Sequence, residues 1–89
     1  MACREWRVAE HRRVIGWLRK HRNYLPLYQR MKNEVLEDPY AYARLKGKCS
    51  RYRRHKRGDI RLIYYVQGCL VVIVAFGFRK NVYKELGCE

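Results

Sequence analysis

Hydrophobic residues change their spacing along the chain, and each spacing predicts a different element. Residues 3–8 alternate weakly, with Trp6 and Val8 on one side and Arg7 on the other, which predicts a short first strand. From about Glu10 to Arg22 the apolar residues recur at helical spacing, while basic residues occupy the opposite side of the helix. The apolar stripe of this predicted helix consists of Val14, Ile15, Leu18 and, beside them, Trp17.

A second helix is predicted to begin near Asn23. This residue can cap the helix, and Pro26 would lie in the first turn, where proline is tolerated. Apolar residues follow at steps of three and four, and Asp38-Pro39 ends the pattern because the residue before proline avoids the helical region. The stripe consists of Leu27, Tyr28, Met31 and Val35, and we expect the two helices to form a hairpin.

The second half of the chain predicts strands. After a connector at residues 39–49, three antiparallel strands are expected at about 50–57, 60–66 and 69–76, separated by Gly58-Asp59 and Gln67-Gly68 turns. The run at residues 70–76 is apolar throughout, which is typical of a central strand covered on both sides. We therefore predict one α+β domain over residues 1–89, with both helices on one face of a mainly antiparallel four-stranded sheet and the other face open.

The net charge of the chain indicates that this domain binds a partner. Lys and Arg number 21 against 8 Asp and Glu, for a formal charge of +13, yet 48% of residues are hydrophobic, so the chain is not a disordered basic tail. A folded domain of this charge favours a polyanion, an acidic protein or an anionic membrane as partner. No apolar stretch reaches the ~20 residues that a membrane span needs.

The cysteines and histidines form no metal-binding pattern. No Cys-x-x-Cys pair occurs, and the three histidines complete no zinc-ligand spacing, so we expect neither a metal nor a cofactor. Arginines near the start interrupt any signal peptide. These features predict a cytoplasmic protein with four free thiols, Cys3, Cys49, Cys69 and Cys88.

Alternation along the basic strand sorts its side chains between the two faces of the sheet. Tyr52, Arg54 and Lys56 should share one face, with Arg51, Arg53, His55 and Arg57 on the other. Arg61 lies in the next strand, on the side of Ile63 and Tyr65. A salt bridge to Asp59 or Glu85 would explain this arginine, and so would a clamp on phosphate, whose oxygens match the guanidinium fork.

The available chemistry is a set of cations and a phenol. The sequence offers no acidic pair for metal-assisted hydrolysis and no Ser or Cys nucleophile with a His and a carboxylate. Cations and a phenol can still cleave RNA, because the 2′-hydroxyl of the substrate is its own nucleophile. Tyr83 would accept the proton if nearby cations favour its phenolate. His55 is intrinsically the better base, but it should face away from Arg54 and is expected to be structural or to contact the RNA backbone.

Three motifs carry a family resemblance. They are Leu45-Lys46-Gly47, Arg54-x-Lys56-x-Gly58-Asp59-Ile60-Arg61-Leu62-Ile63-Tyr64, and Val72-x-Val74-x-x-Gly77-Phe78-Arg79 followed by Tyr83. Together they resemble the RelE/ParE superfamily of type II toxins over roughly residues 45–86. The resemblance implies a compact α+β fold and a cytoplasmic toxin that an acidic antitoxin holds inactive in a hetero-oligomer.

RelE-type members are ribosome-dependent endoribonucleases that cut mRNA in the A site. Carried over by position, the resemblance implies a catalytic set of Arg54, Arg61, Arg79 and Tyr83. We expect the RNA itself to be contacted by Tyr52, Arg53, Lys56, Arg57 and Lys80. Two positions depart from the pattern: Tyr52 stands where some members have lysine, and Phe78 stands where many have histidine. Two alternatives remain open, a ParE-like inhibitor of DNA gyrase without catalysis and a basic RNA-binding module.

Overall fold

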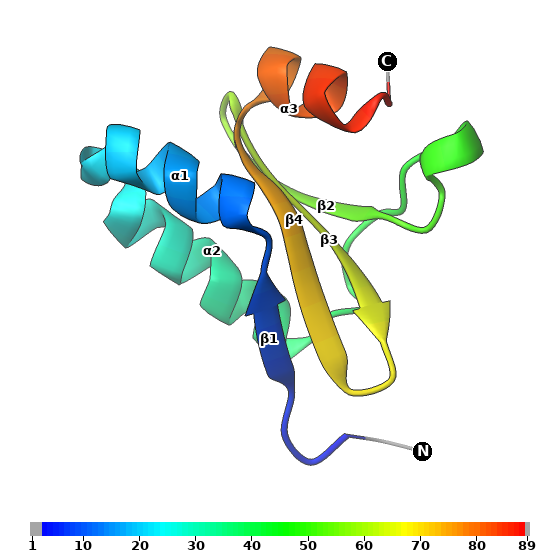
Figure 1. Ribbon diagram of the computed structural model, residues 1–89. Coiled ribbons are helices and arrows are strands. Elements are labelled where there is room, and N and C mark those ends of the chain that lie inside the picture. The colour runs from blue at the N-terminus through cyan, green and yellow to red at the C-terminus, as the bar shows by residue number, and fades with distance from the viewer. Residues whose placement is uncertain (1–2, 89) are drawn as a thin grey trace.

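The computed structural model describes residues 3–88 and has an α+β fold, as predicted (Figure 1). The four-stranded sheet has the order β1-β4-β3-β2, with β1 parallel to β4 and the other pairs antiparallel. The elements are β1 (Arg7–Glu10), α1 (Arg12–Lys20), η1 (Arg22–Tyr24), α2 (Leu25–Glu37), η2 (Gly47–Cys49), β2 (Arg53–Arg57), β3 (Ile60–Gln67), β4 (Leu70–Phe78) and α3 (Arg79–Leu86).

The first strand begins later than predicted, at residue 7 rather than residue 3. Its position is set by β4, because β1 pairs in parallel with residues 70–73. The backbone N–H of Arg7 donates to the Cys69 carbonyl at one end, and that of His11 donates to Ile73 at the other. Val8 is 37% exposed, so the weak alternation in this segment reflects an edge strand with little buried surface.

The helical hairpin covers one face of the sheet, where its apolar stripes meet β3 and β4. Val14 and Leu18 of α1 are buried, whereas Ile15 remains 36% exposed. The predicted Asn23 cap is wrong: Asn23 lies in η1, and Tyr24 precedes α2 without a side-chain cap. Pro26 does lie in the first turn of α2, and the helix ends directly before Asp38.

A hydrogen bond from Tyr28 to Glu10 fastens α2 to the end of β1. Burial raises the pKa of the Tyr28 phenol, and its hydrogen bond to Glu10 raises it further. Lys32 lies 3.8 Å from the same carboxylate, so a cation offsets the charge of Glu10 at this junction. The edge strand is therefore held by side chains as well as by its ladder.

The strand β4 is central, as predicted, and its two sides serve two clusters of apolar residues. Val71, Ile73 and Phe76 face the helical hairpin. Val74 and Ala75 lie on the other face. The expectation that this second face is open is wrong where α3 crosses it, because Val82 packs there with Leu86 beside it. We call these two sides of the sheet the hairpin face and the α3 face.

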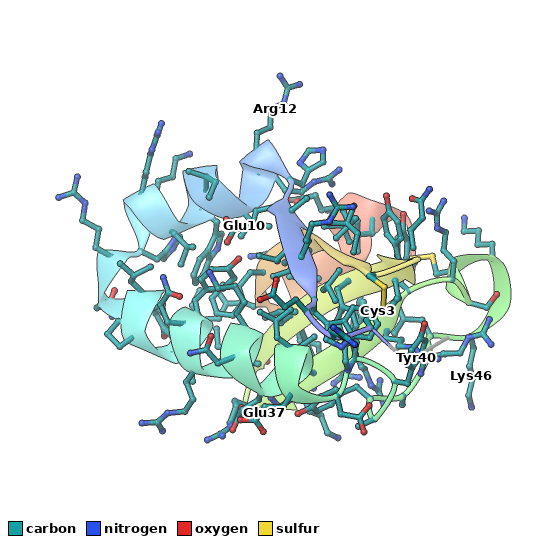
Figure 2. The ribbon with its side chains drawn as sticks, turned by 90° about the horizontal axis from the view of Figure 1, so that it is seen from below. Cys3, Glu10, Arg12, Glu37, Tyr40 and Lys46 are labelled. Atoms are coloured by element: carbon teal, nitrogen blue, oxygen red, sulfur yellow. A yellow bond between two sulfur atoms is a disulfide. The ribbon has the colours of Figure 1, made fainter. Side chains whose placement is uncertain are left out.

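All four cysteines form disulfides, so the predicted free thiols are not observed. Cys3 is bonded to Cys69, with 5.7 Å between their Cα atoms; Figure 2 labels Cys3. Cys49 of η2 is bonded to Cys88, just beyond α3, at a Cα separation of 5.9 Å. Both separations lie in the ordinary range for disulfides. We call them the N-terminal disulfide and the C-terminal disulfide.

Candidate nucleic-acid interface

The basic strand β2 divides its side chains between the two faces of the sheet. Arg54 lies opposite Ile63 and Lys56 opposite Arg61, which assigns both to the α3 face. Arg53 and His55 lie opposite Tyr64 and Leu62, two residues of the hairpin-face core. The predicted alternation is therefore confirmed within β2, where it separates cations that are adjacent in sequence. It is wrong for Arg51, which precedes β2 and whose guanidinium lies over the Tyr65 ring on the α3 face.

Cations on the hairpin face have protein partners. The Arg53 Nη1 donates to the Tyr42 carbonyl at 2.8 Å. Glu34 of α2 accepts from His55 Nε2 at 2.8 Å and from Arg57 Nη2 at 2.8 Å. The hydrogen bond from His55 holds the pKa of Glu34 below its ordinary value, and the charge of Arg57 acts in the same direction. Arg53 and Arg57, two expected RNA contacts, are therefore directed away from Arg54 and engaged within the fold.

Arg61 is buried, with 8% of its surface exposed. Its Nη1 donates to the carbonyl oxygens of Gly58, at 2.7 Å, and Ile60, at 3.0 Å. Neither of the expected salt bridges forms within residues 3–88, where Glu85 pairs with Arg13 instead. Arg61 thus fixes the β2–β3 turn, while its Nε is buried without a partner among residues 3–88.

The first residue of α3 is hydrogen-bonded to this turn. The backbone N–H of Arg79 donates to the Asp59 carbonyl at 2.8 Å, which joins the start of α3 to the turn that Arg61 holds. Tyr83 follows one helical turn later. Its hydroxyl is buried and has no hydrogen-bond partner within the described residues. A buried unpaired hydroxyl costs about 1–3 kcal/mol, so it requires an explanation.

Two hollows flank Tyr83, and both are also lined by Cys88. The first, which we call the strand-side hollow, is about 550 Å³ and is lined by Arg44, Leu45, Lys46, Gly47, Arg54, Tyr83 and Cys88. The second, the turn-side hollow, is about 390 Å³ and is lined by Asp59, Arg79, Lys80, Tyr83 and Cys88. Tyr83 therefore lies between two surfaces that each carry at least two cations.

Of the four expected catalytic residues, the structure brings Arg54 and Tyr83 together in one hollow and Arg79 and Tyr83 in the other. Lys80, an expected RNA contact, joins Arg79. Arg61 lines neither hollow and reaches them only through the Gly58-Asp59 turn. Lys56 is exposed and lies on the same face, opposite Arg61.

Arg44 and Lys46 of the connector also line the strand-side hollow, although the sequence did not predict them as site residues. The connector folds back along β2: the Arg54 N–H donates to the Ala43 carbonyl, and the Leu45 N–H donates to Tyr52. Lys46 belongs to the Leu45-Lys46-Gly47 motif, which was a usable signal. Arg44 had none, because its position depends on this backbone pairing.

Tyr52 lies at the far end of the α3 face. Its ring centroid is 6.1 Å from that of Tyr65, and the Arg51 guanidinium lies 4.2 Å from the Tyr65 centroid. A flat cation over aromatic rings makes a favourable contact and also leaves planar surface on which bases can stack. Tyr52 and Arg51 thus extend the basic face beyond the strand-side hollow.

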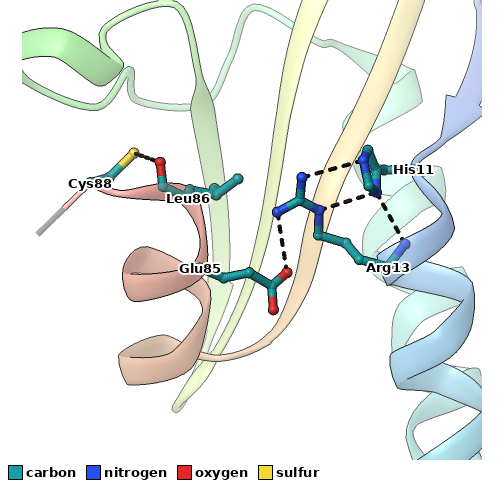
Figure 3. A network of polar contacts seen from close by, with 5 residues as sticks. All are labelled: His11, Arg13, Glu85, Leu86 and Cys88. Atoms are coloured by element: carbon teal, nitrogen blue, oxygen red, sulfur yellow. Dashed lines mark hydrogen bonds and ion pairs between the residues drawn. The ribbon is translucent and has the colours of Figure 1, made fainter.

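A second polar network joins α3 to α1 (Figure 3). Arg13 donates from its Nε to His11 Nδ1 at 3.1 Å and from its Nη1 to Glu85 Oε1 at 3.4 Å. His11 also accepts from the Arg13 backbone N–H, which caps α1. The side of α3 opposite Tyr83 is therefore attached to the helical hairpin by an exposed ion pair.

Within residues 3–88, no cluster of three or more His, Cys, Asp or Glu side chains has a metal-binding arrangement. None of the helices in this part of the chain has the length and apolar character needed to cross a membrane. No protein-family model matches the sequence, and no curated protein matches it either.

Proposed function

We propose that this protein is a RelE-like toxin of the RelE/ParE superfamily, an endoribonuclease that acts in the cytoplasm on mRNA in the ribosomal A site. One observation carries the proposal: Tyr83 lies between two basic hollows, with a hydroxyl that has no partner within the described residues. The motif resemblance over residues 45–86 supports the same function.

In the proposed reaction the 2′-oxygen of the RNA attacks the adjacent phosphorus and the 5′-oxygen of the next nucleotide leaves. The products are a 2′,3′-cyclic phosphate and a 5′-hydroxyl, and no metal is required. Tyr83 accepts the proton of the 2′-hydroxyl, and a proton returns to the leaving oxygen. Positioned cations stabilise the charge that develops on the phosphate, which is a large term in such reactions.

The cations have different roles in this proposal. Arg54 and Arg79 bind the phosphate from the two hollows. Lys80, in the turn-side hollow, and Lys56, on the α3 face opposite Arg61, bind the RNA strand on either side. Arg61 acts through its charge and through its Nε, which has no partner within residues 3–88. It also holds the turn whose Asp59 carbonyl accepts a hydrogen bond from the Arg79 backbone N–H. Arg44 and Lys46 add positive charge at the rim of the strand-side hollow.

The test is cleavage of ribosome-bound mRNA by the purified protein in a reducing buffer. Arg61→Ala and Arg79→Ala are each expected to slow cleavage by about 10²–10³, as does loss of one preorganised donor to a developing oxyanion. A Lys20→Ala variant, which removes an exposed cation of α1, serves as the control. Cleavage at the normal rate by both arginine variants would refute the site assignment.

A non-catalytic RNA-binding module is the second candidate, and the burial of the Tyr83 hydroxyl favours it, because a proton acceptor must reach its substrate. This candidate predicts salt-sensitive binding to RNA with intact RNA ends. A ParE-like role predicts instead that DNA supercoiling by gyrase fails while translation continues. Sequencing of RNA ends together with a supercoiling assay separates the three functions.

The proposed partner is an acidic antitoxin that forms a hetero-oligomer with this chain. A net charge of +13 repels a second copy and attracts an acidic, partly disordered chain. Association should be fast at low ionic strength and slower when salt screens the attraction. Stopped-flow mixing at two salt concentrations measures this directly, and a rate that is independent of salt would contradict the electrostatic account.

A further inference from the structure

The C-terminal disulfide lies at the candidate site, whereas the N-terminal disulfide does not. Cys88 lines both hollows that flank Tyr83. Its partner Cys49 lies in η2, two residues after Gly47 at the rim of the strand-side hollow. Figure 1 shows the C-terminal end of α3 on the same side of the molecule as the η2 loop. Cys3 and Cys69 instead join the start of the chain to the β3–β4 turn.

Backbone hydrogen bonds at the end of α3 connect the disulfide-bonded Cys88 to Tyr83. The N–H of Cys88 donates to the Tyr83 carbonyl at 2.8 Å, and the N–H of Gly87 donates to Lys84 at 3.1 Å. Gly87 has φ +71°, in the left-handed region. This is the Schellman arrangement, in which one glycine reverses the chain at the end of a helix. Cys88 is therefore held against the turn of α3 that carries the phenol.

The hydroxyl of Tyr83 is buried in this disulfide-bonded form, although other atoms of the residue are partly exposed. The Tyr83 hydroxyl has no partner within residues 3–88 and essentially no contact with solvent. A side chain that must accept a proton from RNA cannot remain in that state during the reaction. Cys88 lines both hollows beside Tyr83, and the disulfide holds it there, so we expect motion of residues 87–88 to change access to Tyr83.

We propose that the Cys49–Cys88 bond is a thiol–disulfide exchange site that closes the Tyr83 site when oxidised and opens it when a dithiol reductant reduces it. A thiolate of the reductant attacks Cys88 Sγ, because Cys49 is only 5% exposed, and Cys49 leaves as a thiolate. The second thiol of the reductant then resolves the mixed disulfide and releases Cys88. Two electrons pass to the protein, both cysteines become thiols after protonation, and the reductant becomes a disulfide.

This device rests on the proposed function only for its effect on RNA, and its structural part can be tested alone. The probe is a fluorotyrosine introduced at position 83 of the full-length, oxidised chain. The change in its ¹⁹F shift between H₂O and D₂O reports solvent contact. Dithiothreitol should increase that change, and a C49S/C88S variant should show the increased value with or without the reductant.

The matched control is C3S/C69S, which removes the other disulfide and leaves the Tyr83 site intact. This variant should respond to dithiothreitol as the natural chain does. Cleavage of ribosome-bound mRNA should rise by about tenfold or more on reduction, if the open state is a tenth or less of the oxidised population. The same rise should occur in C3S/C69S and be absent in C49S/C88S.

The outcomes separate the two proposals. Greater solvent contact at position 83 without any cleavage supports the disulfide device and refutes the nuclease. An unchanged ¹⁹F response on reduction refutes the device even if RNA is cleaved. Unfolding of the whole domain by dithiothreitol, seen by circular dichroism, also refutes it, because the bond would then hold the fold together rather than control one site.

Discussion

The arginines of β2 differ in their partners between the two faces of the sheet. On the hairpin face, Arg53 donates to backbone carbonyls and Arg57 pairs with Glu34. On the α3 face, Arg54 opens into a hollow, and the buried Tyr83 hydroxyl and Arg61 Nε lack partners within residues 3–88. Satisfied polar groups stabilise a fold, whereas unsatisfied ones are retained at a cost. Arg53 and Arg57 therefore stabilise the fold on the hairpin face, whereas Arg54 on the α3 face lines a hollow where the proposed function places RNA.

The sharpest test of this difference compares two tyrosines. Tyr83→Phe removes a hydroxyl that has no partner within residues 3–88, so stability should not fall. Under the proposed function Tyr83 is the general base, so cleavage should fall by about 10²–10⁴, the usual contribution of such a group. Tyr64 on the hairpin face donates to the Pro39 carbonyl at 2.6 Å, so Tyr64→Phe should cost about 1–3 kcal/mol by leaving that carbonyl unpaired. Single-turnover cleavage and urea unfolding measure the two effects, and a normal cleavage rate in Tyr83→Phe would contradict the proposed role of Tyr83.

A pair of arginines on β2 gives the next largest effect. Arg54→Ala should weaken RNA binding by about tenfold and reduce the salt dependence by about one phosphate contact. Arg57→Ala should leave RNA binding nearly unchanged, because its guanidinium already pairs with Glu34. Fluorescence anisotropy at several salt concentrations measures both. Equal losses in the two variants would mean that net charge, rather than the face of the sheet, determines binding.

A methyl group added at Gly77, where it would meet Trp17 of α1, should lower the free energy of unfolding. Gly77 has φ +153°, and a Cβ there would lie 2.9 Å from Trp17 Nε1, so Gly77→Ala should destabilise the fold by about 1–3 kcal/mol. Gly16, within α1, has no atom within 4 Å of an added Cβ. Gly16→Ala should therefore stabilise the protein by about 0.5–1 kcal/mol. Chemical unfolding of both variants tests the contact, and a neutral Gly77→Ala would show that Trp17 moves freely.

The smallest effect concerns pH and Glu34. Its pKa is lowered in the folded state, chiefly by the hydrogen bond from His55, so its stabilising contribution is complete above the ordinary carboxyl pKa and is lost as the pH falls through the lowered value. Glu34→Gln should lower stability at neutral pH and flatten the loss on acidification. Urea unfolding from about pH 7 to about pH 3 compares the two chains. Parallel pH profiles would contradict the contribution of this pair.

The sequence predicted the strands, the helical hairpin and the division of β2 between two faces, because these follow from local spacing. The central position of β4 was readable from an unbroken apolar run, and the exposed edge at β1 explains why its signal was weak. The cover that α3 supplies was missed, because Val82 and Leu86 are too few to predict where a short helix packs.

The candidate site was predictable only in part. Arg54, Arg79 and Tyr83 could be chosen by motif, and they line the two hollows. The backbone bonds of Arg61 could not be foreseen, because they depend on the curvature of the turn. The disulfides were missed for a related reason: sequence separations of 66 and 39 residues say nothing about proximity until the topology is known.

The parallel pairing of β1 with residues 70–73 has a consequence for synthesis of the chain. A nascent polypeptide emerges from its N-terminus, so residues 7–10 leave the ribosome long before their partner strand exists. The sheet is complete only after β4 has been synthesised. The slowest contacts to form are those between β1 and β4, which are far apart in sequence. A truncated translation product that stops before residue 70 therefore lacks the central strand and leaves the first strand unpaired, so we expect proteases to degrade it.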